Sequence, residues 1–291
     1  MAINNLTNLN RFRKEEQLVF LNSGQIPGIQ SVNFGNNFGA FPVKHIGINK
    51  VILTSNSPQE GQVKINRMII DGTDPFAPYV TGVSGFNLFV LKDKSNPLDN
   101  YGCTSGYIVN YNTRCGIGEI PISEVDVMSF GNIGCIPSGE SNEVSRQFLN
   151  IPTSTTNYNL KVPGAGSVSI TLNNDIVLNR VQSYNLSITA DRKAIYALGS
   201  RYPIAVEINY PISIGFNFSC AVSNYSGMNV RDFPILPKTG NLILSINNFA
   251  DNVNIQSFRF TGMQLISENV NNDTETSMNL NANYVGFLTR Y

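Results

Sequence analysis

Residues that could do chemistry are scarce in this sequence, and their spacing does not favour a catalytic site. A nucleophilic dyad or triad needs a general base beside its nucleophile, and His45 is the only histidine. No G-x-S-x-G elbow supplies a serine, the nearest run being Gly82-Val-Ser-Gly85. Cys115 could pair with His45, but nothing in the sequence places the two side by side. We therefore expect no catalytic residues and no enzymatic activity.

Sites for metals, phosphates and cofactors have no better support. The oxygen-rich segments 71–74 and 271–275 do not fit the twelve-residue calcium loop, and turn chemistry explains both. Gly116-x-Gly118 is not followed by a lysine or a helix signal, so we expect no phosphate cradle, no metal and no cofactor. The four cysteines lack the C-x-x-C spacing of zinc sites, and we expect them to be reduced. They are Cys103, Cys115, Cys135 and Cys220.

The composition describes a neutral chain with a polar, weakly charged surface. Its 291 residues include 20 Lys and Arg against 20 Asp and Glu, so the formal net charge is zero. Asparagine is as frequent as all charged residues together, 40 of each. Zero net charge removes the electrostatic footprint of a nucleic-acid-binding protein, and weak repulsion between copies favours association. Paired carboxylates for sugar hydrolysis need no motif, but the lack of Trp disfavours a sugar site.

Hydrophobic and polar residues alternate over long stretches, which is the period of a β-strand with one buried face. The clearest run extends from Ile212 to Val222. Turn-favouring Asn, Gly, Pro and Asp bound the runs. The pattern predicts an all-β, antiparallel fold. Further runs lie at 32–34, 51–53, 63–69, 86–90, 107–111, 125–127, 184–190, 204–210, 242–246 and 278–284.

Helical signals are few, and the chain divides near its middle. Arg11–Leu21 and Ser141–Leu149 predict one or two short amphipathic helices. The segment 150–166 is rich in Thr, Pro and Gly, as inter-domain connections are. We expect three parts: a polar N-terminal arm outside the core at 1–28, a first β domain at 29–150 and a second at 151–291.

The two predicted domains have similar features in the same order. Residues 29–34 align with 181–186 at a shift of 152 residues. Each series has a strand, a loop with an apolar-Gly end, a second strand, a Pro-containing turn and a long amphipathic strand. This order favours internal duplication, and two unrelated β halves of similar composition are the alternative. The matched pairs are Gln30 with Gln182, Gly47 with Gly199 and, after one inserted residue, Pro58 with Pro211.

Basic residues cluster in the second half within the segment 190–203. Arg192 and Lys193 stand at its start, and Arg201 stands near its end. Two interpretations are open. The segment is either a solvated loop or a loop that contacts a neighbouring subunit.

The run from Gln182 to Pro203, followed by the long alternating strand, resembles tail tube and related virion structural proteins of tailed bacteriophages. In pieces, the resemblance covers most of residues 29–290. Other similar blocks lie at 106–112, 116–121, 131–133 and 258–265.

The resemblance implies β-sandwiches whose sheets join those of neighbouring subunits into a ring-shaped barrel, usually sixfold. Such rings stack, and DNA passes through the lumen. Some members have two tube-like units per chain and form trimers with pseudo-sixfold symmetry. The internal duplication fits that version, and a homo-hexamer is the alternative. The implied partners are further copies of the chain, other tail proteins and DNA that passes non-specifically. The implied location is the tail of a virion assembled in the bacterial host cytoplasm.

In such a ring, Ser213, Asn217 and Ser219 are expected to face the lumen, where small neutral groups would let DNA slide. Glu207 is the negative candidate on these strands, and residues 1–27 are expected to contact the next ring. No apolar run approaches the ~20 residues of a membrane-spanning helix, so we expect no membrane partner. The alternatives are another virion β protein, such as a distal-tail or baseplate hub ring or a capsid decoration protein, or a receptor- or carbohydrate-binding β-sandwich.

Overall fold

The fold consists almost entirely of antiparallel strands, which confirms the all-β prediction. One short helix, α1 (Ala77–Val80), occurs within the described residues. The predicted helix at Arg11–Leu21 is wrong at its end, because Leu18–Leu21 is a strand, and Ser141–Leu149 lies outside the described residues. The computed structural model describes residues 18–22, 24–37, 40–44, 51–56, 60–70, 74–91, 100–136, 167–200, 202–221, 236–248, 253–272 and 278–288.

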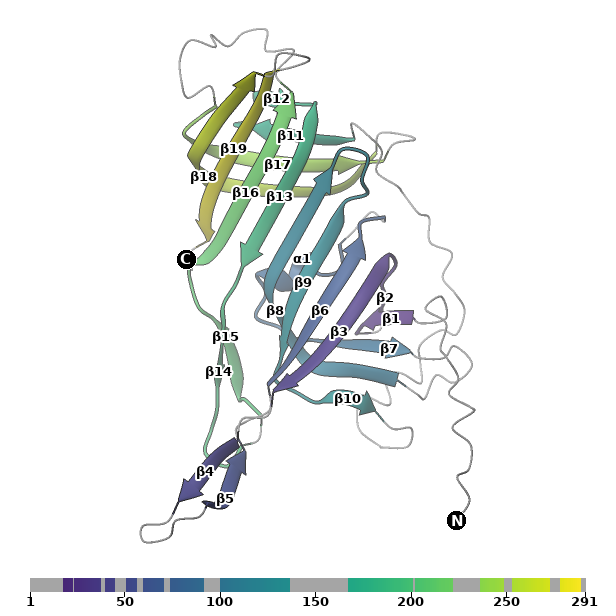
Figure 1. Ribbon diagram of the computed structural model, residues 1–291, viewed down its shortest axis with the longest axis vertical. Coiled ribbons are helices and arrows are strands. Elements are labelled where there is room, and N and C mark those ends of the chain that lie inside the picture. The colour runs from purple at the N-terminus through teal and green to yellow at the C-terminus, as the bar shows by residue number, and fades with distance from the viewer. Residues whose placement is uncertain are drawn as a thin grey trace.

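The first half of the chain forms a module of ten strands (Figure 1). Their hydrogen-bonded order is β2-β1-β7-β8-β9-β6-β3, with β10 beside β8, while β4 and β5 form a separate ribbon. The strands are β1 (Leu18–Leu21), β2 (Gly24–Gln25), β3 (Ile29–Asn37), β4 (Ala40–Lys44), β5 (Val51–Asn56), β6 (Glu60–Met68), β7 (Phe86–Leu91), β8 (Asn100–Gly116), β9 (Ile122–Ser129) and β10 (Ile133–Ile136).

The second half forms a module of nine strands with the same arrangement. Its order is β12-β11-β17-β18-β19-β16-β13, and β14 pairs with β15 in a ribbon. Each strand has its counterpart at the same place in the first module, from β1 and β11 to β9 and β19. The strands are β11 (Val168–Leu172), β12 (Ile176–Leu178), β13 (Val181–Thr189), β14 (Arg192–Ile195), β15 (Ala205–Ile208), β16 (Ile212–Ala221), β17 (Thr239–Asn247), β18 (Asn254–Asn272) and β19 (Met278–Leu288).

The two modules agree in register as well as in strand order. Phe34 pairs with Val63 in the first module, and Leu186, 152 residues later, pairs with Phe216 in the second. Both ladders are bulged at the start of the earlier strand. The bulge in β8–β9 after Ile108 also recurs in β18–β19 after Leu265. A one-residue slip would turn every side chain to the opposite face, so the shared registers mean that both modules bury the same positions.

Each module is a β-sandwich whose two layers share one long, bent strand (Figure 1). The N-terminal half of β8 pairs with β7, and its C-terminal half pairs with β9 in the other layer. In the second module, β18 pairs in the same way with β17 and β19. The alternation predicted for 212–222 is confirmed over β16, where Ile214, Phe216 and Phe218 are buried between the layers.

The expectation of a polar arm outside the core at 1–28 is wrong for the last third of that segment. Val19, Phe20 and Leu21 of β1 are buried against β7, and Ile26 is buried as well. The run Leu18–Leu21 is wholly apolar because the strand lies in the core of the second layer. The first module therefore begins by Leu18, and its counterpart β11 opens the second module at Val168. The expected connection at 150–166 lies outside the described residues.

Candidate assembly interface

The modules are joined edge to edge by β13 and the C-terminal half of β8 (Figure 1). This joint, here called the seam, runs antiparallel from the pair Ser183–Gly116 to the pair Thr189–Asn110. Because β13 also pairs with β16, the seam makes one continuous sheet of both modules. Apolar side chains of β13 are fully buried under it, with Leu186 at 0% exposure.

Side chains on the inner side of the seam close it against water. Thr113 Oγ1 and Tyr184 Oη lie 3.4 Å apart, one from each module. Burial raises the pKa of the Tyr184 phenol above its ordinary value, so the phenol stays neutral there. The rings of Tyr111 and Phe258 lie 6.0 Å apart across the same boundary. The seam is therefore a packed interface as well as a backbone ladder.

Arg192 fastens the second module to the first by its guanidinium group. Its Nε donates to the carbonyl oxygen of Ile108 at 3.0 Å, and its Nη1 donates to that of Gly82 at 2.7 Å. Its Nη2 reaches the carbonyl oxygens of Tyr79 and Val80, both at 3.1 Å. Burial lowers the pKa of this half-buried group. Arg192 is thus a contact within the chain, which corrects its assignment to a solvated or inter-subunit loop.

The other charged candidates of this region lie on the β14–β15 ribbon. Lys193 is directly opposite Glu207, and both side chains are exposed. Glu207 therefore stands on the ribbon and not on the main sheet, which corrects its expected place among the lumen strands. Near the end of the ribbon, Tyr202 Oη donates to Asn132 Oδ1 of the first module at 2.7 Å. Arg201 lies outside the described residues.

Ser213, Asn217 and Ser219 share the polar face of β16, as the alternation predicted. Asn217 lies between Asn185 of β13 and Asn283 of β19 in one cross-strand row. This amide row borders an open hollow of about 1040 Å³ on the polar face of the sheet. The face therefore presents neutral hydrogen-bonding groups beside the hollow.

Charges on the same face of the first module occur in pairs. Arg114 Nη2 lies 2.7 Å from Glu124 Oε1, and Lys64 Nζ lies 3.7 Å from Asp126 Oδ1. Glu60 is a further charge at the start of β6 on this face. Paired exposed charges contribute little to stability, but their opposite charges cancel at a distance, so these two pairs add almost no net charge to the face.

The structure describes four of the six residues that the repeat matches. Gln30 is exposed on β3, and Gln182 Oε1 accepts a hydrogen bond from Ser219 Oγ at 3.3 Å. Gly199 has a φ of 81°, a conformation that favours glycine. Pro211 follows a cis peptide bond just before β16. The other two matched residues, Gly47 and Pro58, lie outside the described residues.

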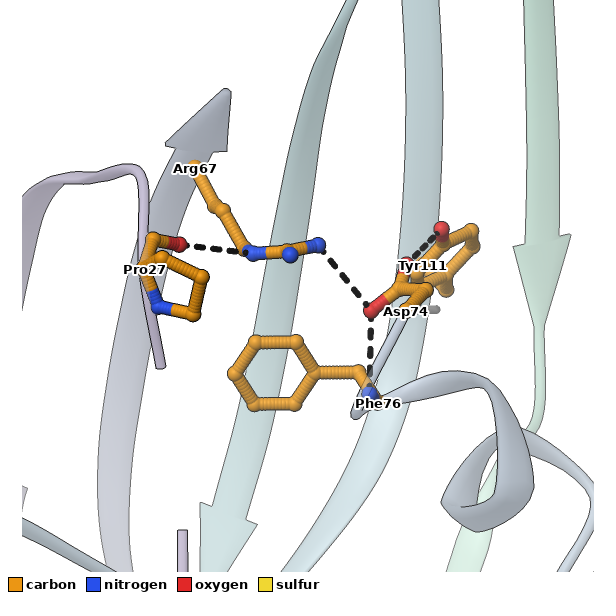
Figure 2. Close-up of polar contacts among 5 residues, drawn as sticks. All are labelled: Pro27, Arg67, Asp74, Phe76 and Tyr111. Atoms are coloured by element: carbon orange, nitrogen blue, oxygen red, sulfur yellow. Dashed lines mark hydrogen bonds and ion pairs between the residues drawn. The ribbon is translucent and has the colours of Figure 1, made fainter. Parts of the chain in front are cut away.

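A buried polar cluster braces the first module behind the seam (Figure 2). Arg67, with 0% exposure, donates from Nε to the carbonyl oxygen of Pro27 at 3.0 Å, and its Nη1 lies 3.5 Å from Asp74 Oδ1. Asp74 also accepts hydrogen bonds from the Phe76 amide and the Tyr111 hydroxyl. Burial and the neighbouring Asp74 raise the pKa of Tyr111 well above its ordinary value. The cluster ties β6, β8 and the approach to α1 together.

Within the described ranges, no three His, Cys, Asp or Glu side chains lie together as they would to hold a metal ion. Cys103, Cys115 and Cys220 form no disulfide, and burial raises the pKa of each thiol. A raised thiol pKa makes a poor nucleophile at neutral pH. His45 lies outside the described residues.

Sequence reasoning missed the two strand edges that the seam leaves open. Among the described residues, β3 pairs only with β6, and residues 267–272 of β18 pair only with β19. A signal for the first edge is present in the sequence, since β3 has no charged residue and no proline, the usual protections of an exposed edge. Strand pairing is non-local, however, and alternation alone does not show which strands lie at an edge.

Comparison with known proteins adds no relative. No protein-family model and no curated protein matches this chain. No helix in the part of the chain that the structure describes has the length and hydropathy of a membrane-spanning segment.

Proposed function

We propose that this protein is a structural virion protein that assembles into stacked rings and forms the tail tube of a bacteriophage, a conduit for DNA. The observation that supports the proposal most is the seam, in which two modules with the same strand order are joined edge to edge within one chain. A joint of this kind can repeat between chains. Closure into a ring by rotational symmetry would then pair the two edges that correspond to the seam, those of β3 and of the end of β18.

The polar face of the sheet agrees with a conduit for a polyanion. Its amide row, Asn185, Asn217 and Asn283, offers no fixed charge, and the nearby Arg114–Glu124 pair cancels. Affinity for DNA grows with the number of phosphates that cations neutralise. A nearly uncharged wall would therefore let DNA pass without strong retention. The proposed partners are copies of the same chain, other tail proteins and transient DNA, and the proposed location is the virion.

Native mass spectrometry and cryo-electron microscopy of the purified protein test this function. The expected result is closed rings that stack at high concentration, with three chains and six modules per ring. Labelling of virions with an antibody to the chain should mark the tail along its length. Labelling confined to the tail end or to the capsid would instead assign the protein to a terminal ring or a decoration role. A monomer that never associates would contradict both the ring and the tube.

A further inference from the structure

We propose that β3 of one chain pairs antiparallel with residues 267–272 of β18 in a second copy, in the register that β13 uses on β8. The inference rests on the ring assembly proposed above and names its contact strands, their polarity and their register. We assign further copies of the same chain to both open edges. The counterparts of β3 and β18 are β13 and β8, and these two strands already pair with each other within the chain.

The register follows from the correspondence of the modules. Strand β3 corresponds to β13 at a shift of 152 residues, and β8 corresponds to β18 at a shift of 157, since the bulges after Ile108 and Leu265 coincide. Within the chain, Leu186 lies opposite Thr113, and Asn185 lies opposite Arg114. The same ladder between chains places Phe34 opposite Val270, Asn33 opposite Asn271 and Gly35 opposite Asn269.

Side chains at both open edges are less buried than their counterparts at the seam. Leu186 and Tyr184 are 0% and 3% exposed at the seam, whereas their counterparts Phe34 and Val32 are only partly buried. On the opposite side, Thr113 is 0% exposed, whereas its counterpart Val270 is only partly buried. A second copy would cover these side chains as the other module covers their counterparts.

The hollows beside the two equivalent strands differ in which modules supply their walls. Residues 181–184 border a hollow of about 140 Å³, whose opposite wall is the first module at 115–119. The equivalent residues 29–32 border a hollow of about 400 Å³. Among the described residues, only the first module lines this second hollow, and no neighbouring module supplies an opposite wall. The missing wall would lie where the end of β8 lies beside β13.

The two ribbons differ in the same way, since one lies beside a neighbouring module and the other does not (Figure 1). The β14–β15 ribbon lies beside the first module and holds it through Arg192 and Tyr202. Its counterpart, β4–β5, projects away from the rest of the chain. Position 40, which corresponds to Arg192, is an alanine, so the joint between chains lacks the guanidinium clamp and should separate more readily than the seam.

Paired cysteines test the register. In Asn33→Cys/Asn271→Cys, both substituted side chains are exposed, and directly opposite strand residues are close enough for a disulfide. Mild oxidation of assembled protein should give covalent dimers and higher species on a non-reducing gel. The matched control, Asn33→Cys/Ser267→Cys, is displaced by four residues and should lose them. As a positive control, Asn185→Cys/Arg114→Cys should form the equivalent bond within one chain.

The outcomes separate this inference from the proposed function. If rings form but Asn33→Cys/Asn271→Cys gives no cross-links, or if the displaced pair cross-links more strongly, the proposed register is wrong. The proposed ring assembly would still stand. A monomer at all concentrations would overturn both. Hydrogen exchange of the wild type needs no substitution: amides of β3 and of residues 267–272 should exchange at least about 10-fold more slowly in the assembled than in the dissociated protein. Unchanged exchange at both edges would contradict the pairing.

Discussion

Arg192 of the second module donates a 2.7 Å hydrogen bond to the carbonyl oxygen of Gly82 in the first. The same guanidinium also reaches the carbonyl oxygen of Ile108 and lies 5.9 Å from the centre of the Tyr107 ring. One side chain therefore contacts β8, the turn after α1 and an aromatic ring, all across the module boundary. The planar group of an arginine suits this task because its five donors point in fixed directions.

Removal of this clamp should weaken the chain as a whole. We expect Arg192→Ala to lower the free energy of unfolding by about 2–4 kcal/mol, because several charge-assisted hydrogen bonds are lost and carbonyl groups are left unpaired. Urea titration followed by tyrosine fluorescence measures the loss. The neighbouring exposed lysine is the control, and Lys193→Ala should cost no more than about 0.5 kcal/mol. Equal costs for the two variants would show that Arg192 does not hold the modules together.

The Arg67–Asp74 pair should respond strongly to loss of one partner. We expect Asp74→Ala to cost about 3–5 kcal/mol, since a buried guanidinium would lose its carboxylate. The double variant Arg67→Met/Asp74→Ala should recover a large part of this loss, because no buried charge then remains. Thermal and urea unfolding of the three proteins check the pattern. A cost below about 1 kcal/mol for Asp74→Ala would mean that the cluster is dispensable.

Alkaline pH should destabilise the fold because buried thiols and phenols must lose protons. Burial raises the pKa of Cys220 to about 11 and that of Cys103 to about 12, from 9.0. It also raises the pKa values of Tyr111 and Tyr184. The folded chain holds these protons more tightly than the unfolded chain does. The resulting stability is therefore fully present below about pH 9 and is lost as the pH rises through the folded-state values.

Urea titrations between about pH 7 and pH 11 measure this dependence, and the midpoint should be constant at first and fall above about pH 9. The decline should be shallower in Tyr184→Phe, which removes one buried phenol. Ser187→Ala changes the same strand without removing an ionisable group, so its decline should follow the wild type. A wild-type midpoint that stays constant to pH 11 would contradict the burial of these groups.

The thiols themselves should be hard to modify in the native protein. Cys103 and Cys220 are 0% and 1% exposed, and their raised pKa values leave little thiolate at pH 8. We expect iodoacetamide to label them only after denaturation, and Cys115, which is half-buried, to label faster than either. Peptide mapping by mass spectrometry gives the order. Rapid native labelling of Cys220 would show that the layers of the second module open readily.

Strand type and facing could be predicted from this sequence, because alternation reports one buried face directly. Ile214, Phe216 and Phe218 were placed correctly for that reason. Leu18–Leu21 was misread as the end of a helix, since a short apolar run beside charged residues has no period of two. The equal order of strands in the two halves could also be inferred, although only five of the aligned residue pairs are identical.

The roles of individual polar side chains could not be predicted. Arg192 contacts carbonyl groups more than 80 residues earlier in the sequence, and no local pattern indicates such a partner. Glu207 alternates correctly on its strand, yet that strand belongs to a ribbon outside the main sheet. Pairing between distant strands depends on the whole topology, so the open edges of β3 and β18 became visible only with the fold.

The neutral amide row should keep the affinity of the assembled protein for DNA low. We expect the wild type to show weak binding of a short labelled duplex, because the row is uncharged and Arg114 and Lys64 on the same face are each paired with a carboxylate. Lysines at Asn185, Asn217 and Asn283 should create binding that falls with salt, by a slope of about −0.9 per neutralised phosphate. Fluorescence anisotropy over a salt series measures both. Lysines at the exposed residues Val177, Leu198 and Val253 add the same charge away from the row, and should give a smaller slope. Tight, steeply salt-dependent binding by the wild type would contradict a sliding surface.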